Sequence, residues 1–410
     1  MTDLALRLLR DGYHAVSKDR RARAGGPTYV SRLLGRRTVV LGDAAGAALF
    51  YDEAVVRRKG AVPPPLSWLL FGRGAVHGLD AGPHRDRKLM FLELLSPERL
   101  TPLVDGVTAR LGATMRSWTG RDVVLFDELV RAYGGAVLEW AGVPVDGPGS
   151  DRISRRLASI VDGFGFGGAA YARAWRDRLW ADRWATGLVD DVRAGVLTPP
   201  AGSALAMVAA TPALSSRTAG VELLNLLRPT VAVAWLGTFA GQALHQAPEW
   251  RSRMAPDGAV RERYAFAQEV RRTTPFAPAL AGLVLRPTTH AGVPIRRGDR
   301  LLLDVIGIHR DPRHWPEPTA FRPERFLDDH EYGGRVADAF ELVPQGGGHP
   351  SGHRCPGESA ALRLLMATAQ CLATVHYETA EPTHVDLSRI PTLPTHGLRL
   401  TDVRVAAGLG

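Results

Sequence analysis

The sequence has few of the residues that mark several classes of protein. Two cysteines, Cys355 and Cys371, in 410 residues are too few for a disulfide framework. Only Lys18, Lys59 and Lys88 are lysines, so the formal charge of +9 depends on arginines, which are interspersed with acidic residues. Charge spread in this way indicates a solvated surface and argues against a nucleic-acid partner.

Long hydrophobic runs are also missing. The longest apolar stretch, residues 230–244, is shorter than the roughly 20 residues that a membrane-spanning helix requires. Charged residues interrupt residues 1–16, which therefore lack the pattern of a signal peptide. We expect a cytoplasmic protein that does not insert into a membrane.

The fold class follows from the hydrophobic pattern. Hydrophobic residues make up 45% of the chain, and most of them recur at three- and four-residue intervals, as in amphipathic helices. The sequence therefore predicts a mainly α fold with a minor β region. The expected helices cover residues 4–18, 44–50, 96–119, 127–141, 152–164, 171–194, 217–244, 261–273 and 358–372.

Strand signals are short and clustered. The third of them contains Arg297-Gly298-Asp299, which we expect to form a hairpin turn. We expect one domain over residues 1–410, with its β-rich parts near 30–60, 280–305 and 390–406. The expected strands cover residues 37–42, 281–286, 293–305 and 398–405.

A glycine-rich loop, PQGGGHPSGHRCPGES (residues 344–359), presents Cys355 just before a helix. Helix N-termini stabilise thiolates through free backbone N–H groups and the helix dipole. The arrangement suits a catalytic nucleophile, a zinc ligand or a haem axial ligand. No base signature accompanies a nucleophile, and His349, His353 and Cys355 would supply only three zinc ligands.

Two further features draw attention to the centre of the chain. Glu269 and Arg272 are three residues apart on a predicted helix and can pair, and FRPERF (residues 321–326) places Arg325 between them and the cysteine loop. The long apolar helix at 217–244 contains Arg228 and Pro229 in its middle. Both are costly there, because a buried charge needs a partner and a proline removes a backbone hydrogen bond.

The order and spacing of these motifs resemble those of a cytochrome P450. The motifs are Glu269-x-x-Arg272, HRDPRHW (309–315), FRPERF and GHRCPGE (352–358). LLRP, QEVRR, PQGGG and LFGRGAVHGLD (70–80) further resemble the fatty-acid peroxygenase branch of that family. The resemblance implies haem b with Cys355 as the thiolate ligand of its iron, and Glu269, Arg272 and Arg325 as structural residues.

The resemblance also implies a reaction. Arg228 would hold the carboxylate of a medium- to long-chain fatty acid, and Pro229 would open the helix beside it. The clamped carboxylate would replace the acid–threonine pair of monooxygenases as general acid–base, so that H2O2 serves without a redox partner. His77 is expected above the haem, where histidine accompanies decarboxylation to terminal alkenes, with Phe71 beside it. Oxidation would fall on Cα or Cβ.

Further residues are expected to contact cofactor or substrate. Arg58, His84, Arg87, Lys88 and His353 are expected near the haem propionates. Phe276 and Ala279 are expected to line the substrate pocket, and the small Ala279 should widen it where relatives tend to have an aromatic residue. The remaining pocket contacts are expected from Phe164 and Phe166.

Two other functions fit the sequence. One is a conventional monooxygenase that uses O2 and redox partners, although Asn225-Leu-Leu-Arg228-Pro229 lacks the acid next to threonine that such enzymes carry. The other is a haem-thiolate protein that binds fatty acids without turnover. The sequence does not distinguish chain length, product or oligomeric state.

Overall fold

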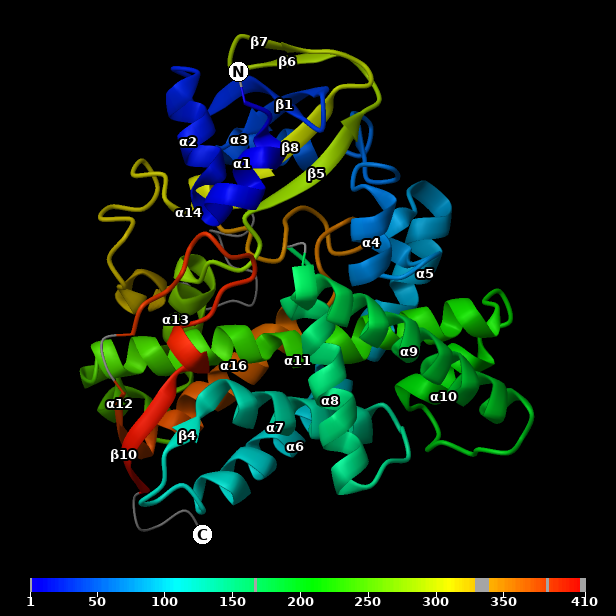
Figure 1. The fold of residues 1–410 in the computed structure, drawn as a ribbon, viewed down its shortest axis with the longest axis vertical. Helices are drawn as coiled ribbons and strands as arrows, with labels where there is room; N and C mark the ends of the chain where they lie inside the picture. The colour runs from blue at the N-terminus through cyan, green and yellow to red at the C-terminus, as the bar shows by residue number, and fades with distance from the viewer. Residues whose placement is uncertain (1, 166–167, 329–338, 381–382, 406–410) are drawn as a thin grey trace.

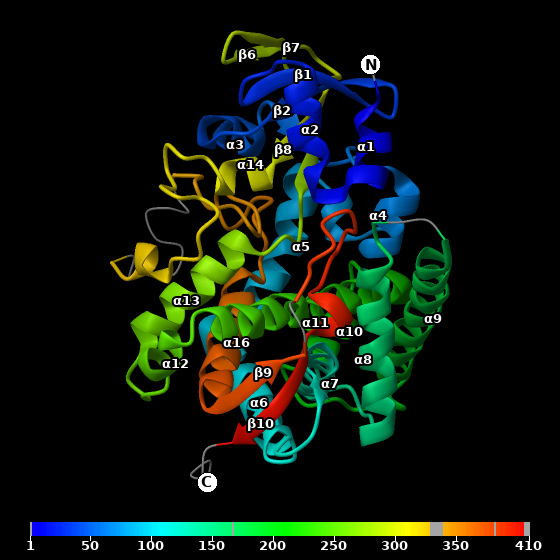
Figure 2. The same cartoon turned by 60° about the vertical axis from the view of Figure 1, so that its left-hand side comes forward.

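A computed structural model describes residues 2–165, 168–328, 339–380 and 383–405. The protein is mainly α-helical with small sheets, which confirms the predicted fold class (Figures 1 and 2). The helices are α1 (Leu4–Asp11), α2 (Ala15–Ala22), α3 (Ala44–Tyr51), α4 (Pro64–Leu70), α5 (Ala81–Leu94), α6 (Pro97–Met115), α7 (Leu125–Trp140), α8 (Gly147–Asp162), α9 (Gly168–Arg193), α10 (Ala204–Ala210), α11 (Ser216–Gln246), α12 (Glu249–Met254), α13 (Val260–Thr273), α14 (Val305–His309) and α16 (Glu358–Ala373).

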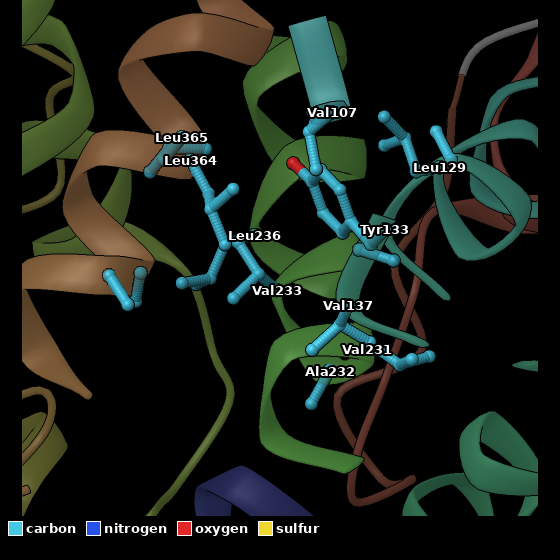
Figure 3. Close-up of a cluster of buried hydrophobic side chains, with 14 of the residues drawn as sticks. Val107, Leu129, Tyr133, Val137, Val231, Ala232, Val233, Leu236, Leu364 and Leu365 are labelled. Atoms are coloured by element: carbon cyan, nitrogen blue, oxygen red, sulfur yellow. The ribbon is translucent and has the colours of Figure 1, made fainter. Parts of the chain in front are cut away.

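Helix α11 runs through the middle of the helical part and positions the site (Figure 1). It begins at a capped N-terminus, where the Ser215 hydroxyl accepts a hydrogen bond from the Thr218 N–H. From Ala219 to Leu244 nearly every residue is buried, and the helix packs against α9, α7 and α16. Figure 3 shows Val233 and Leu236 of α11 between Leu364 of α16 and Tyr133 of α7.

The length and composition of α11 would allow it to cross a membrane. However, 89% of its most apolar window is buried inside the protein. No other helix of the described residues meets the same criteria. The apolar character of α11 is therefore that of a central core helix, which is covered by its neighbours on every side.

The described residues form three sheets. The largest has the order β1-β2-β8-β5-β3, with β8 parallel to β2 and antiparallel to β5. The others are β4-β10-β9 and the ribbon β6-β7. The strands are β1 (Thr28–Leu33), β2 (Arg36–Leu41), β3 (Val56–Arg57), β4 (Val123–Val124), β5 (Ala279–Val284), β6 (Thr288–His290), β7 (Val293–Ile295), β8 (Arg300–Asp304), β9 (Val375–Thr379) and β10 (Arg399–Val405).

Two local predictions were wrong. The expected hairpin around Arg297-Gly298-Asp299 is a turn between strands of different sheets, because β7 pairs with β6 while β8 pairs with β2 and β5. The helix expected over residues 4–18 divides into α1 and α2 at Gly12, whose φ is +52°. A Cβ there would approach the backbone of Leu387 and Ser388 to about 2.4–2.5 Å, so the close chain crossing requires glycine.

Candidate active site

The loop before α16 holds the Cys355 side chain. The backbone N–H of Cys355 donates to the Gln345 carbonyl at 2.9 Å, which closes the loop on itself. Gly346 adopts φ +90°, and a Cβ there would meet the hydroxyl of Tyr51 at 2.6 Å. Burial and the charge of Glu358 raise the pKa of the Cys355 thiol, while the Gly357 N–H and the charges of Lys88 and Arg271 oppose that shift. The thiolate form thus has donors and cations in place around it.

Lys88 holds the cysteine loop directly. Its Nζ, on α5, donates to the carbonyls of Gly352, at 2.9 Å, and Arg354. Arg271 of α13 also contacts the loop, where it donates to the Gln345 side chain at 2.9 Å. Lys88, which was expected near the haem propionates, therefore donates to the backbone of the cysteine loop.

Arg271 also connects the loop to α16. Its Nη2 lies 2.6 Å from a carboxylate oxygen of Glu358, and Arg354 lies 2.6 Å from the other oxygen. Both arginines and Glu358 are largely buried. The two ion pairs fix the start of α16 relative to the loop, and with it the direction of the Cys355 side chain.

A second cluster brings together three of the predicted haem contacts. The rings of His84 and His353 stack with centroids 4.0 Å apart, and His353 Nε2 lies 3.2 Å from Asp80 Oδ1. Asp80 also accepts the backbone N–H of Arg58 at 2.9 Å. The Arg58 guanidinium lies over the Phe50 ring, 3.7 Å from its centroid. Burial lowers the pKa of His84 to about 4, so its imidazole is neutral at pH 7.

Arg87 does not join this cluster. Its Nη1 donates to Glu222 Oε1 of α11 at 2.9 Å and to the Gly74 carbonyl. Glu222 is fully buried, and Arg87 is its counter-ion. The structure thus gives Arg87 a protein counter-ion, and its role at the haem propionates stays a prediction.

Arg228 lies in the middle of α11 and is 5% exposed. Its Nη2 is 3.5 Å from the neutral Asn225 Oδ1, and its Nε is buried without a hydrogen-bond partner. Burial, together with the charge of the nearby Arg178, lowers the pKa of Arg228 to about 9, although Cys355 opposes the shift. Within the described residues no ion pair joins a carboxylate to Arg228, so this buried cation lacks a compensating anion.

Pro229 does not open the helix as expected. Helix α11 continues through it from Ser216 to Gln246, and the missing N–H leaves only the Asn225 carbonyl without its usual helical donor. The next residue, Thr230, donates its hydroxyl to the Leu226 carbonyl at 2.9 Å. That hydroxyl is thereby engaged by its own helix.

His77 lies in the short 3-10 turn Val76–Gly78 and stacks on Phe71, with ring centroids 4.0 Å apart and 15° between planes. Burial among protein atoms lowers the pKa of His77 to about 3, with Arg228 the next contribution. The His77 residue is nevertheless exposed, so its neighbours surround the ring without covering it. Phe71 also lies 5.9 Å from Arg228, measured from its ring centroid to the guanidinium carbon. The structure thus brings the predicted distal residues together.

The remaining predicted pocket residues follow α13 or lie between α8 and α9. The Phe276 ring is 6.2 Å from Trp235 of α11, and its carbonyl accepts the Tyr13 hydroxyl at 2.8 Å. Ala279 begins β5 opposite Asp304 of β8. Phe164 follows the end of α8 and is partly buried. Phe166 lies outside the described residues.

Glu269 and Arg272 form a fully buried ion pair with two contacts of 2.6 and 2.7 Å. Arg272 also donates to backbone carbonyls of the segment between β8 and the cysteine loop, among them His309 at 2.8 Å. Arg325 lies 3.7 Å from Glu269. These groups bind the long irregular segment to α13 and so support the loop that carries Cys355.

Arg272→Ala is expected to lower the free energy of unfolding by about 3–5 kcal/mol, because it leaves the Glu269 carboxylate buried and unpaired. Arg253→Ala is the matched control. It removes an exposed 2.9 Å pair with Glu324 and should cost less than about 1 kcal/mol. Urea denaturation followed by circular dichroism would measure the free energy of unfolding of both variants. Equal losses of stability would contradict the structural role of the Glu269–Arg272 pair.

The residues around Cys355 fit a haem group. A thiol directed by a glycine loop at a helix start is the donor that ferric iron takes in haem-thiolate proteins. The buried Arg228 has an Nε without a hydrogen-bond partner. No group of three His, Cys, Asp or Glu side chains suited to a metal ion occurs in the described ranges, so zinc gains no support. Cys355 would ligate the iron, with Arg58, His84 and His353 nearby.

Comparisons with known proteins agree with this fit. A family model for cytochrome P450 matches residues 264–391. The structure of cytochrome P450 CYP152B1 in complex with (R)-ibuprofen is 33% identical, with TM-score 0.91 over 99% of this chain and 100% of that chain. A variant of cytochrome P450 OleT in complex with arachidonic acid is 29% identical, with TM-score 0.92 over 99% and 97% of the two chains.

A plant relative matches over a shorter region. Xanthotoxin 5-hydroxylase CYP82C2 from Arabidopsis thaliana is 38% identical over 133 residues, which are 32% of this chain and 25% of that protein. The alignment therefore spans a quarter of the relative's length. The cysteine loop and the buried Glu269–Arg272 pair lie inside the region that the family model matches.

The fold and the cysteine site define a haem-thiolate oxidoreductase, and the chain belongs to the cytochrome P450 family. Haem b ligated by cysteine is its cofactor. Within the family it belongs with CYP152B1 and OleT, in the fatty-acid peroxygenase branch that its motifs resemble.

Sequence reasoning missed two polar residues of the site. Glu222 was not singled out, and Asn225 was noted only as part of a motif. Glu222, Asn225 and Arg228 are spaced by three residues and so share one face of α11. A carboxylate, an amide and a guanidinium in a row on an otherwise apolar helix is the signal that would have identified them.

Proposed function

We propose that the protein is an H2O2-dependent peroxygenase of medium- to long-chain fatty acids. It would hydroxylate them at Cα or Cβ, decarboxylate them to terminal alkenes, or both. Peroxide would replace O2, so no redox partner is required, and the enzyme would act in the cytoplasm. The OleT variant in complex with arachidonic acid supports this choice of substrate class.

The observation that carries the proposal is the unpaired Arg228. A guanidinium presents two parallel donors to a carboxylate, and such charge-assisted bonds are strong where water is excluded. Arg178 adds positive charge near the same position. A fatty-acid carboxylate would supply the anion that the protein does not, with Phe71 beside it.

The chain's own acids leave the proton chemistry to the substrate. Glu222, the acid on α11 closest in sequence to Arg228, accepts hydrogen bonds from Val76, Arg87 and Asn225. The Thr230 hydroxyl is bound to Leu226. The bound haem supplies the oxidising chemistry. A carboxylate held by Arg228 would take a proton from one oxygen of H2O2 and return it to the other.

The function is tested by incubating purified ferric protein with a saturated C14 acid and H2O2, without reductase and without O2. Mass spectrometry should detect hydroxyacid, 1-alkene or both. Product formed only when NADPH and redox partners are added would indicate the monooxygenase alternative. Binding of the acid without peroxide consumption would indicate a non-catalytic binder.

His77→Gln is expected to shift products from alkene toward hydroxyacid. Burial keeps the His77 imidazole neutral above about pH 3, so it acts through its position over Phe71 and its hydrogen-bonding nitrogens. Loss of one such interaction is worth about 1 kcal/mol, which is roughly fivefold in the product ratio. Product quantification with unchanged affinity for the acid would confirm the effect, whereas an unchanged ratio would contradict it.

A further inference from the structure

Glu222 and Asn225, on one face of α11, connect the His77 turn to Arg228. Glu222 Oε1 accepts the Val76 N–H, next to His77, at 2.8 Å. Glu222 Oε2 accepts Asn225 Nδ2 at 3.0 Å. Asn225 Oδ1 in turn faces Arg228 Nη2 at 3.5 Å. One buried carboxylate is thus linked to the His77 turn and, through a neutral amide, to the guanidinium.

The orientation of the Asn225 amide is determined by its neighbours. Its Nδ2 faces two groups that only accept, Glu222 Oε2 and the Phe71 carbonyl at 3.1 Å. The oxygen must therefore point the other way, toward Arg228. Burial raises the pKa of Glu222, while Asn225, Arg87 and the Val76 N–H oppose that shift. Every group that contacts its oxygens is a donor, so a proton on Glu222 would have no acceptor and the contacts favour the carboxylate.

A neutral amide can orient Arg228 without neutralising it. The negative charge of Glu222 is compensated by Arg87, at 2.9 Å, and not by Arg228. The contact from Asn225 to Arg228 is long and uses one of the five N–H donors of the guanidinium. The guanidinium keeps its positive charge, and its other N–H donors remain for a ligand.

We propose that Glu222 and Asn225 are positioning residues that hold Arg228 in the orientation for a carboxylate and fix the His77 turn relative to it. The proposal rests on the proposed function, in which Arg228 binds the substrate carboxylate. In Glu222→Gln the new amide cannot satisfy both sets of donors. Either its nitrogen faces Val76 and Arg87, or it faces Asn225 Nδ2 and reverses the Asn225 amide so that an NH2 group meets Arg228.

The test compares dissociation constants of tetradecanoic acid and 1-tetradecanol for the holoenzyme by calorimetry. The two ligands differ only in the head group, so their ratio reports on Arg228 and not on the rest of the pocket. Glu222→Gln and Asn225→Ala should each weaken acid binding about tenfold, as expected for one charge-assisted hydrogen bond, and leave alcohol binding unchanged. The control is Gln242→Ala. Gln242 lies farther along α11 and contacts Thr383, so its removal should change neither acid binding nor alcohol binding.

The outcomes separate this proposal from the function on which it rests. If wild type binds acid and alcohol equally, the proposed function fails. If wild type prefers the acid and Arg228→Ala does not, while both network variants keep the preference, the positioning role alone is overturned. An equal loss for both ligands, or failure of both variants to fold, would show a merely structural role and would also overturn it. If only Glu222→Gln fails to fold, the ratio of the acid and alcohol dissociation constants in Asn225→Ala decides whether the positioning role holds.

Discussion

Arg228→Ala is expected to lower kcat/KM for fatty acids in the peroxide-driven reaction by about 10²–10⁴-fold. Two charge-assisted hydrogen bonds to the substrate carboxylate, each worth about 1.5–3 kcal/mol, would be lost together. The carboxylate would also lose the position from which it transfers a proton. Initial rates with a C14 acid, at equal haem content, measure the effect.

Two companion variants sharpen the Arg228 experiment. Arg228→Lys keeps the charge but loses the planar pair of donors, so its rate should fall between those of wild type and Arg228→Ala. Arg73→Ala removes an exposed arginine that lies over Trp68, 4.1 Å from its ring centroid, and should leave the rate unchanged. Wild-type turnover in Arg228→Ala would exclude the carboxylate clamp.

Cys355→Ser is expected to abolish turnover and the absorption band that reduced haem-thiolate proteins show with carbon monoxide. The serine hydroxyl does not supply the thiolate whose electron donation favours O–O cleavage. The backbone N–H of Gly357 and the cations Lys88 and Arg271 would then surround a neutral group. Spectra of the reduced protein with carbon monoxide, together with product analysis, measure both losses.

The second cysteine provides the matched control for Cys355→Ser. Cys371 lies within α16 and is buried, and burial raises the pKa of its thiol to about 11. Cys371→Ser should cost about 1–3 kcal/mol of stability, because it buries a hydroxyl, but the folded enzyme should keep its spectrum and turnover. Loss of the thiolate band in Cys371→Ser would contradict the assignment of Cys355.

The parts of the site that could be predicted from sequence are those in which neighbouring residues act together. The glycine loop with Cys355, and Arg228 beside Pro229, are contiguous motifs. The apolar period predicts both the helix that follows the loop and the helix that contains Arg228. Glu269 and Arg272 are also one helical turn apart. Local spacing is enough in these three cases.

Partners that are distant in sequence could not be predicted in this way. Arg87 and Glu222 are 135 positions apart, and Lys88 and Gly352 are 264 apart, so no local pattern relates them. The turn at Arg297-Gly298-Asp299 was predicted, but the pairing of its flanking strands depends on β2 and β6. Such pairings are decided by tertiary packing.

The composition of α11 has a consequence for the chain before it folds. Between Leu223 and Leu244 the only charged residue is Arg228, so without it the translocation machinery would meet a segment long enough to span a bilayer. An arginine near the centre of such a helix disfavours insertion by about 2.5–3.5 kcal/mol. The side chain proposed to receive the substrate would thus also help to keep the newly made polypeptide out of the lipid phase.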